Sequence, residues 1–224
     1  SDLFLVSDAK IFIFLSTVKA VTDSLEIILT EDYKPNPITH YGKSKLLAEQ
    51  YILSKIIPNN KRVYILRPCM IYGPGNKGNL NLLYNLAKKG LPWPLGSFEN
   101  KRSYCSIDNL CFVINELIEN NQIPSGIYNI SDDEPLSTNE LIKLIYESQY
   151  RKPLILNIPK FLIYLIAKLG DIFSFSINTE NLLKLTETYI VSNNKIMAAI
   201  DKPLPLSAKE GLMKTLNSFN TNVK

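Results

Sequence analysis

The stretch KIFIFLS (residues 10–16) is a short, continuous run of apolar and β-preferring residues. Such a run is typical of a strand that is buried on both faces, as strands in a parallel sheet are. A second run, RVYILRP (residues 62–68), has the same character and ends at a proline, which cannot donate a hydrogen bond to a neighbouring strand. Between the two runs lies a helical segment at about residues 40–57, which ends before Pro58. This order predicts two parallel strands joined by a helix.

The alternation of strands and helices continues along the chain. Short strands are predicted at RSYCSI (residues 102–107) and GIYNIS (residues 126–131). Helices are predicted at about residues 79–89, 108–120 and 137–150, and the last third of the chain is mostly helical. This pattern predicts an α/β fold with a parallel sheet.

The charge of the chain is mildly basic, with 25 Lys and Arg against 21 Asp and Glu and a formal net charge of +4. The basic residues are scattered, which argues against a nucleic-acid partner. The three cysteines show no C-x-x-C spacing and the chain has one histidine, so we expect neither a disulfide framework nor a metal site. Reduced thiols are typical of a cytoplasmic protein.

The most apolar stretch covers residues 158–175, but Pro159, Lys160, Lys168 and Asp171 interrupt it. A membrane-spanning helix needs about 20 predominantly apolar residues. We therefore expect a buried or interface helix here and no membrane span. We also expect no signal peptide, because the first apolar run is too short and lacks a basic leader.

The most informative polar feature is the pair Tyr41 and Lys45. Residues four apart lie on one face of a helix, and a nearby ammonium favours the phenolate form of a tyrosine. The spacing alone identifies nothing, because three other tyrosines also have a lysine four residues later. Gly42 and Ser44 distinguish this pair, since small residues would let a flat cofactor approach. Thr17, at the end of the first strand, adds a hydroxyl where sites of parallel sheets lie.

The loop GPGNKG (residues 73–78) matches the G-x-G-x-x-G pattern of dinucleotide-binding loops, and Glu99 lies about 20 residues further on, where a ribose-binding acid would be. We reject it as the dinucleotide fingerprint, because the five residues PCMIY (residues 68–72) stand between the strand residues RVYILR and the loop, and Pro74 removes a backbone donor. A helix that begins near Asn79 still offers free N–H groups to an anion such as a phosphate.

Five segments occur in one order along the chain: FLSTVKAV, YGKSKLLAEQ, ILRPCMIYGPGNKGNL, NKRSYCSIDNL and GIYNISDDEPLSTNEL. The ordered series resembles the extended short-chain dehydrogenase/reductase family, and within it the nucleotide-sugar epimerase and dehydratase branch. The resemblance covers about residues 10–219. It implies that the chain is the C-terminal part of a Rossmann-type parallel sheet with a smaller, mostly helical substrate-binding lobe.

The resemblance also implies a division of the chain into domains. Residues 1–75 and 103–128 would form the C-terminal part of the NAD(P)-binding Rossmann domain, and residues 76–102 and 129–224 the nucleotide-sugar-binding lobe. The glycine fingerprint and the first strands of the family have no counterpart in this sequence, so we expect an N-terminally truncated fragment. We expect NAD or NADP to bind weakly or not at all to this chain alone.

The resemblance assigns three catalytic residues. Tyr41 matches the acid/base of the family, and Lys45 matches the lysine that holds the nicotinamide ribose and favours the phenolate. Thr17 matches the hydroxyl that binds the reacting oxygen. Tyr41 and Lys45 would therefore also contact the cofactor, NAD or NADP. Asp108 and Ser137, in contrast, are interpreted as helix N-caps.

The resemblance assigns binding residues as well. Ser16, Arg67 and Pro68 match positions that border the cofactor at the ends of two strands. Asn79 and Arg102 match positions that contact the diphosphate of a nucleotide sugar. The structural alternatives are an ion-pair partner for Arg67 and a solvated surface charge for Arg102.

The reaction implied by the resemblance is hydride transfer at the sugar C4, with a tyrosine taking the hydroxyl proton. We expect an NAD-dependent 4-epimerase of a UDP-hexose or a UDP-N-acetylhexosamine. The alternatives are an NAD(P)H-dependent 4-keto-reductase of a UDP-sugar and a non-catalytic, dinucleotide-sensing protein. A 4,6-dehydratase is disfavoured, because Val18 and Lys19 stand where those enzymes carry Asp and Glu.

The resemblance also implies a homodimer, in which the helix that carries the tyrosine and the lysine packs against its twin. Leu46, Leu47, Tyr51 and Ile52 would supply the apolar part of that contact. Ordinary core packing of these side chains is the alternative.

Overall fold

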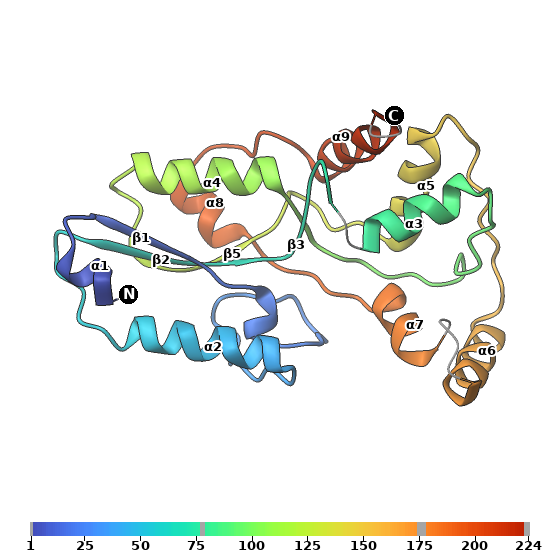
Figure 1. Ribbon diagram of the computed structural model, residues 1–224, viewed down its shortest axis with the longest axis horizontal. Helices are drawn as coiled ribbons and strands as arrows, with labels where there is room; N and C mark the ends of the chain where they lie inside the picture. The colour runs from blue at the N-terminus through green and yellow to red at the C-terminus, as the bar shows by residue number, and fades with distance from the viewer. Residues whose placement is uncertain (1, 77–78, 174–177, 222–224) are drawn as a thin grey trace. The chain divides into compact units, whose positions relative to one another are not determined.

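The computed structural model describes residues 2–76, 79–173 and 178–221, and Figure 1 shows its helices and strands. The chain forms two compact units and alternates between them along its length. The first, called here the sheet unit, consists of Ser1–Ile71, Ser103–Asp133 and Tyr189–Ser207. The second, called here the helical unit, consists of Tyr72–Arg102, Glu134–Thr188 and Ala208–Lys224.

The sheet unit is built on the strands β1 (Ile11–Leu15), β2 (Arg62–Pro68) and β5 (Gly126–Ile130). They pair in the order β1-β2-β5, and both pairs are parallel. The prediction of an α/β fold with a parallel sheet is therefore confirmed. Because the strands run in the same direction, their carboxyl ends lie at one common edge of the sheet.

One face of this sheet is covered by α4 (Ile107–Glu119) and α8 (Asn194–Ile200), as Figure 1 shows. Side chains from both helices join Tyr64 and Leu66 of β2 in the larger hydrophobic core. The two β2 residues are fully buried, and they are two positions apart, which puts them on the same face of the strand.

The opposite face is covered by α2 (His40–Leu53) and the short α1 (Asp2–Val6). Here Val63 and Ile65 of β2 pack with Phe4 of α1 in a second, smaller core. Alternate residues of β2 therefore enter two different cores, as expected for a strand that is buried on both faces. α2 is shorter than predicted, and α1 lies in a segment for which the sequence predicts no helix.

A small second sheet pairs β3 (Met70–Tyr72) with β4 (Tyr104–Ser106). β4 was predicted, whereas β3 is only three residues long and gives no periodic signal. α4 begins directly after β4, and Ser106 is its N-cap, with the hydroxyl accepting a hydrogen bond from the Asp108 amide at 3.2 Å. The interpretation of Asp108 as the N-cap is therefore wrong. Asp108 lies in the first turn, where a negative charge is favourable near the helix N-terminus.

Among the described residues, the helical unit contains five helices: α3 (Asn79–Lys88), α5 (Thr138–Ser148), α6 (Lys160–Phe173), α7 (Thr179–Thr186) and α9 (Ala208–Thr221). α5 packs against both α3 and α9, and α6 packs against α7. The prediction that the last third of the chain is mostly helical is confirmed.

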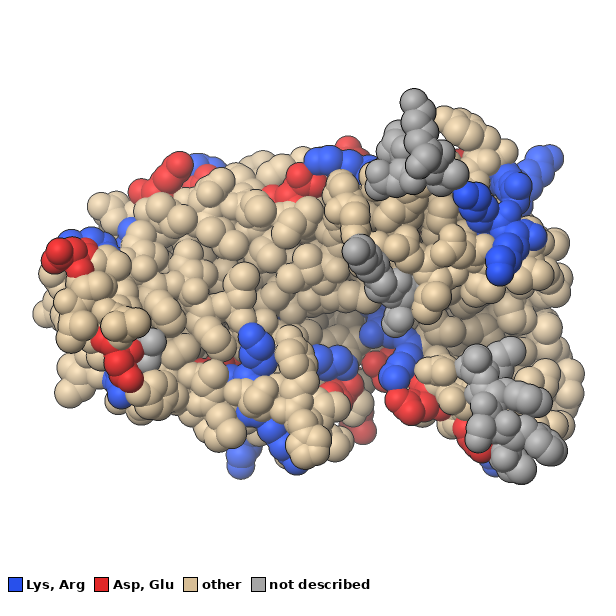
Figure 2. Space-filling model, in the orientation of Figure 1, with Lys and Arg blue, Asp and Glu red and all other residues tan. Residues whose placement is uncertain are grey.

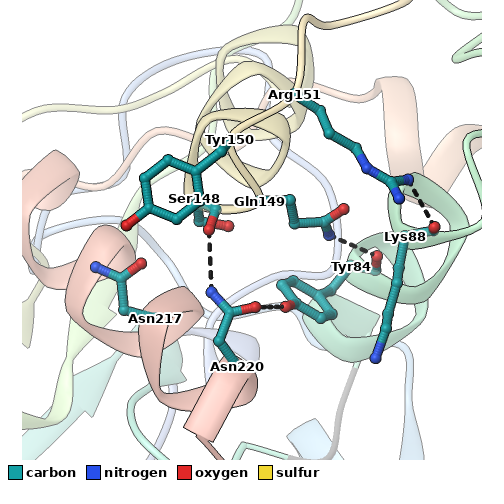
Figure 3. A pocket seen from close by; sticks show the side chains of 8 residues that line it. All are labelled: Tyr84, Lys88, Ser148, Gln149, Tyr150, Arg151, Asn217 and Asn220. Atoms are coloured by element: carbon teal, nitrogen blue, oxygen red, sulfur yellow. Dashed lines mark hydrogen bonds between the residues drawn. The ribbon is translucent and has the colours of Figure 1, made fainter.

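A pocket of about 450 Å³ lies among α3, α9 and the end of α5 (Figure 3). The Tyr84 hydroxyl donates to the Asn220 side-chain oxygen, and the Asn220 amide donates to the Ser148 carbonyl at 3.0 Å. Arg151 donates to the Lys88 carbonyl at 2.8 Å. These bonds connect the three helices, so the polar groups around this pocket hold the helical unit together.

The division into units differs from the predicted domains mainly at residues 189–207, and by a few residues at 72–75 and 129–133. Residues 189–207 were assigned to the substrate-binding lobe, but the structure groups them with the sheet unit. The reason is hydrophobic packing: Tyr189, Val191 and Ile196 are buried in the larger core of the sheet unit. The chain returns to the sheet unit before its last helix.

The capping box at the start of α5 is confirmed. The Ser137 hydroxyl accepts a hydrogen bond from the Glu140 amide at 3.0 Å, and a Glu140 carboxylate oxygen accepts one from the Ser137 amide at 2.8 Å. The backbone hydrogen bond from Ser137 is the largest cause that lowers the pKa of Glu140 below its ordinary value.

We predict that Ser137→Ala lowers the free energy of unfolding by about 1 kcal/mol, measured by urea unfolding. A carboxylate whose pKa is lowered by folding stabilises the protein above its unfolded pKa and loses this effect as the pH falls through the folded pKa. The difference between the wild type and Glu140→Gln should therefore be largest near neutral pH and shrink below about pH 4. An unchanged stability of Ser137→Ala would contradict the cap.

Candidate active site

The carboxyl end of β1 carries the first predicted catalytic residue. Thr17 follows Ser16 and is the N-cap of a 3-10 turn, η1 (Val18–Ala20), where its hydroxyl oxygen accepts a hydrogen bond from the Lys19 amide at 3.3 Å. Ser16 is buried and Thr17 is half-buried. A hydroxyl that accepts a hydrogen bond keeps its O–H for donation, so Thr17 can still bind a second oxygen.

The start of α2 is fixed by Asp23 and Thr39. The Thr39 hydroxyl accepts from the Gly42 amide at 3.2 Å, and Asp23 accepts from the amides of Ile38 and Thr39 at 2.7 and 3.1 Å. Burial raises the pKa of Asp23, but the hydrogen bonds from these two amides outweigh it and leave the pKa below its ordinary value. The loop that follows β1 thus holds the helical turn that contains Tyr41.

Gly42 brings this turn of α2 into contact with η1. A Cβ at this position would lie 2.3 Å from the Lys19 carbonyl oxygen and 2.9 Å from the Pro37 Cβ, which only a backbone shift could relieve. The absence of a side chain therefore allows α2 to lie against the segment that follows Thr17, with Tyr41 beside it. The sequence predicts a small residue here for the approach of a cofactor, and the structure adds a packing reason.

Lys45 connects α2 to the end of β1. Its ammonium donates a hydrogen bond to the Leu15 carbonyl at 2.9 Å and lies 5.0 Å from the centre of the Phe14 ring. Tyr41, one turn earlier on α2, is 56% exposed, so its phenol is accessible to a ligand. Lys45 therefore contacts the end of β1 two residues before Thr17, and Tyr41 lies one turn earlier on the same helix.

A buried ion pair lies behind these residues and joins β1, α2 and β2. Glu49 of α2 is 1% exposed and Arg67 of β2 is 2% exposed. Two guanidinium nitrogens of Arg67 donate to the two carboxylate oxygens of Glu49 at 3.0 and 2.6 Å, and the Ser16 hydroxyl donates to the same carboxylate. Glu49 lies four residues after Lys45, on the same side of the helix. The network thus holds the lysine-bearing helix against two strand ends.

Two polar side chains at this edge keep unpaired atoms. Arg67 and Asn129 are register partners on β2 and β5, so their side chains point to the same face of the sheet. Within the described part of the chain, the third guanidinium nitrogen of Arg67 and both amide atoms of Asn129 are buried without a hydrogen-bond partner. An unpaired buried polar group costs about 1–3 kcal/mol. These groups lie at the strand-end edge, where parallel sheets bind ligands.

Sequence reasoning missed Glu49, although a signal was present in its spacing from Lys45. Ser16 and Arg67 were predicted to border a cofactor, and the structure shows both bonded to Glu49. The ion-pair alternative for Arg67 is therefore confirmed. Pro68, the last residue of β2, is buried beside it. Contact of Ser16, Arg67 and Pro68 with a cofactor stays a prediction.

The two predicted substrate-binding residues belong to the helical unit. Asn79 is the first residue of α3, as expected, and its side chain lies outside the part that the structure describes. The Arg102 guanidinium donates to the Lys184 carbonyl near the end of α7 and lies 3.9 Å from the Glu187 carboxylate. Arg102 is thus anchored to the end of a helix, and its contact with a diphosphate stays a prediction.

Other kinds of site find little support in the described residues. Nowhere in residues 2–76, 79–173 and 178–221 do three His, Cys, Asp or Glu side chains gather closely enough to hold a metal ion. Figure 2 shows Lys and Arg at several separate places on the displayed face, interspersed with Asp and Glu. Of the helices described, none has both the length and the apolar composition needed to cross a bilayer.

The fold defines a class: α/β proteins with a parallel sheet, here with Thr17 after the first strand and Tyr41 and Lys45 on the helix that follows. Residues 4–158 match the model of the 3-beta hydroxysteroid dehydrogenase/isomerase family, and the chain belongs to this family. Together with the relatives below, this match confirms the resemblance to extended short-chain dehydrogenases/reductases of the epimerase branch.

Two curated relatives are 4-epimerases by name. The chain is 30% identical over 217 residues to the UDP-glucose 4-epimerase of Vibrio cholerae. The alignment covers 95% of this chain and 64% of that protein. The chain is 29% identical over 172 residues to the N-acetyl-alpha-D-glucosaminyl-diphospho-ditrans,octacis-undecaprenol 4-epimerase of Escherichia coli O157:H7, covering 74% of this chain and 48% of that protein. The chain therefore spans less than two thirds of the length of either relative.

A similar solved structure is the UDP-glucose 4-epimerase of Thermus thermophilus in complex with NAD. The TM-score is 0.68 at 21% sequence identity, and the match covers 96% of this chain and 65% of that chain. At this identity the likeness shows the fold, and it agrees with the parallel sheet described above.

We predict that Gly42→Ala destabilises the protein, although Gly→Ala inside a helix ordinarily stabilises by about 1 kcal/mol. The added Cβ collides with the Lys19 carbonyl, and relieving such overpacking costs about 1–3 kcal/mol, measurable by urea unfolding. Ser44→Ala, at an exposed position of the same helix, is the control and should change little. A gain in stability for Gly42→Ala would contradict the close contact.

We predict that Glu49→Gln lowers the free energy of unfolding by about 3–5 kcal/mol, because it leaves the charge of Arg67 buried without its partner. Removing both charges, in Glu49→Leu with Arg67→Met, should recover much of this loss. The control is Glu180→Gln, which breaks the exposed pair with Lys184 and should cost little. Equal effects of Glu49→Gln and Glu180→Gln in urea unfolding would contradict the role of the buried pair.

Proposed function

We propose that this chain supplies the catalytic residues of an NAD-dependent nucleotide-sugar 4-epimerase that acts on a UDP-hexose or a UDP-N-acetylhexosamine. The observation that carries the proposal is the hydrogen bond from Lys45 to the Leu15 carbonyl, which holds the helix that carries Tyr41 and Lys45 against the end of β1, two residues before Thr17. The names of the two relatives support 4-epimerisation, and the Thermus complex supports NAD. The activity is proposed for the whole protein, because this chain spans 64% and 48% of the lengths of the two relatives.

The residues at the end of β1 fit the nicotinamide end of a dinucleotide. Tyr41 presents an exposed phenol, and the Lys45 ammonium already lies at the strand end. Tyr41 and Lys45 would hold the ribose by hydrogen bonds, and Ser16 and Arg67 would support this edge from behind through Glu49. When bound, NAD supplies the acceptor and donor of a hydride at the sugar C4.

Tyr41 would act as the acid and base of the reaction. Its phenol oxygen would take the proton of the C4 hydroxyl and return it on the reverse step. The Thr17 hydroxyl would donate a hydrogen bond to the same sugar oxygen and hold it in place. The positive charge of Lys45 would stabilise negative charge on the phenol oxygen.

The diphosphate of the substrate would bind to the helical unit. Arg102 carries a permanent positive charge and several donors suited to phosphate oxygens, and its anchoring to the Lys184 carbonyl restricts the guanidinium. Asn79, at the start of α3, lies where free backbone amides favour an anion. We therefore propose Asn79 and Arg102 as the diphosphate contacts.

The residues after Thr17 argue against a dehydratase. Val18 is buried, and the Lys19 ammonium donates to the Asp23 carbonyl at 2.8 Å and lies 4.2 Å from the centre of the Tyr189 ring. Neither residue offers a carboxyl group for removing water from the sugar. The 4-keto-reductase remains the second candidate, because it needs the same three catalytic residues.

The exposure of the apolar side chains of α2 indicates which of them could contact a second copy in the proposed homodimer. Leu47 and Tyr51 are exposed and available for a contact with a second copy, and Leu46 is half-buried. Ile52 is buried in the smaller core of the sheet unit, so its assignment to the dimer face is wrong. We propose a homodimer of the intact protein through the exposed side of α2.

A cytoplasmic location is part of the proposal. Cys69, Cys105 and Cys111 are present as thiols, and burial raises the pKa of the Cys105 thiol well above its ordinary value. A high pKa disfavours the reactive thiolate form, and reduced cysteines fit a reducing compartment.

The reaction is tested with the intact protein and defined substrates. Turnover of UDP-N-acetylglucosamine or UDP-glucose without added NADH supports the epimerase. Oxidation of NADH in the presence of a 4-keto-sugar nucleotide supports the reductase instead. Tight dinucleotide binding without turnover of any of these sugars would favour the dinucleotide-sensing alternative.

We predict that Tyr41→Phe in the intact protein lowers kcat by about 10²–10⁴-fold, because it removes the group that carries the proton. The chain offers a matched control in Tyr51→Phe, which lies on the same helix, also has a lysine four residues later, and loses its hydrogen bonds with Asp2 and Lys55. An unchanged rate for Tyr41→Phe, or equal losses for both variants, would contradict the assignment.

A further inference from the structure

α6 turns most of its large apolar side chains away from the helical unit. Ile163 and Ala167 are buried and mark the side of the helix that faces the protein. The sequence predicts a buried or interface helix here, yet many of its large apolar residues are exposed. These exposed residues are Phe161, Leu162, Tyr164, Leu165, Ile166 and Leu169.

The outermost part of this surface is a stripe formed by Phe161, Leu165 and Leu169, which are four residues apart and therefore lie on one side of the helix. Phe161 and Leu165 are each two residues from Ile163, which corresponds to about 200° around the helix axis. They are 68% and 54% exposed. A surface helix normally turns polar residues outward, so this stripe indicates an interaction surface.

The charges on α6 are those of Lys160, Lys168 and Asp171. Both lysines are exposed, and Lys168 lies next to the stripe, between Phe161 and Asp171 in the helical projection. Asp171 accepts hydrogen bonds from the amide and the hydroxyl of Thr179 at 2.9 and 2.6 Å, so it is occupied at the start of α7. The Lys160 ammonium lies 5.7 Å from the centre of the Phe98 ring, so Lys168 supplies the positive charge directly beside the stripe.

We propose that α6 docks on the surface of an anionic lipid bilayer. The apolar stripe would enter the boundary between headgroups and acyl chains, while Lys160 and Lys168 would meet anionic headgroups at its border. α6 has 14 residues, too few to span a bilayer, so it would lie in the plane of the surface. This surface belongs to the helical unit, whereas the proposed catalytic residues belong to the sheet unit, and the proposal does not depend on the proposed function.

The test is co-sedimentation of the chain with vesicles of phosphatidylcholine alone or with about one third phosphatidylglycerol added. The vesicles that contain phosphatidylglycerol should bind the chain more tightly, and raising the salt concentration should weaken this binding. Phe161→Ser with Leu165→Ser should reduce it at least about tenfold, because two large apolar side chains no longer enter the lipid. Lys160→Gln with Lys168→Gln should reduce it about tenfold or more and remove most of the salt dependence.

The matched control is Ile27→Ser with Ile28→Ser, two loop residues of the sheet unit that are 66% and 53% exposed. This control should leave vesicle binding unchanged, and thermal unfolding followed by circular dichroism should show that all three double variants remain folded. Failure of the wild-type chain to bind either vesicle would overturn the proposal. So would equal losses in the α6 and loop variants. Self-association that the α6 serine variant abolishes, without vesicle binding by the wild type, would assign the surface to a second copy of the chain instead.

Discussion

The structure of the candidate active site depends on the buried ion pair between Glu49 and Arg67. Burying two charges away from water is costly unless they form a well-aligned ion pair. Here two guanidinium nitrogens of Arg67 donate to the two carboxylate oxygens of Glu49, and the Ser16 hydroxyl donates to the same carboxylate. These three residues come from α2, β2 and the end of β1. A rotation of α2 by one residue would leave both charges unpaired, so the pair specifies which face of the helix lies over the strand ends. That face is the one that carries Lys45.

The sheet was predictable because its signal is local. The runs KIFIFLS and RVYILRP contain little besides β-preferring apolar residues, and each forms a parallel strand. The division of the chain into units was not predictable in the same way, because the residues 189–207 join the sheet unit through side chains such as Tyr189 and Ile196, which pack against segments far away in sequence. The short helix α1 likewise depends on Phe4 reaching the smaller core.

The residues of the candidate site also fall into those that local sequence identifies and those that depend on the packing of distant segments. Tyr41, Lys45 and Thr17 could be chosen from the sequence, because small neighbours and a strand end distinguish them locally. The roles of Ser16 and Arg67 could not, because both depend on where Glu49 falls when α2 packs on the sheet. Gly42 was singled out for the approach of a cofactor, whereas the structure gives a packing reason, its contact with the Lys19 carbonyl. The unpaired amide of Asn129 gives no sequence signal at all.

The contacts that place the tyrosine-bearing turn are made largely with main-chain atoms. Lys45 binds the carbonyl oxygen of Leu15, and Gly42 lies against the carbonyl oxygen of Lys19. Every amino acid carries a carbonyl, so the exposed side chain at position 15 is free to diverge among descendants of this protein while position 42 stays confined to glycine. Evolutionary drift at the strand end would therefore leave the arrangement intact, and variability at position 15 would be no sign that the site has decayed.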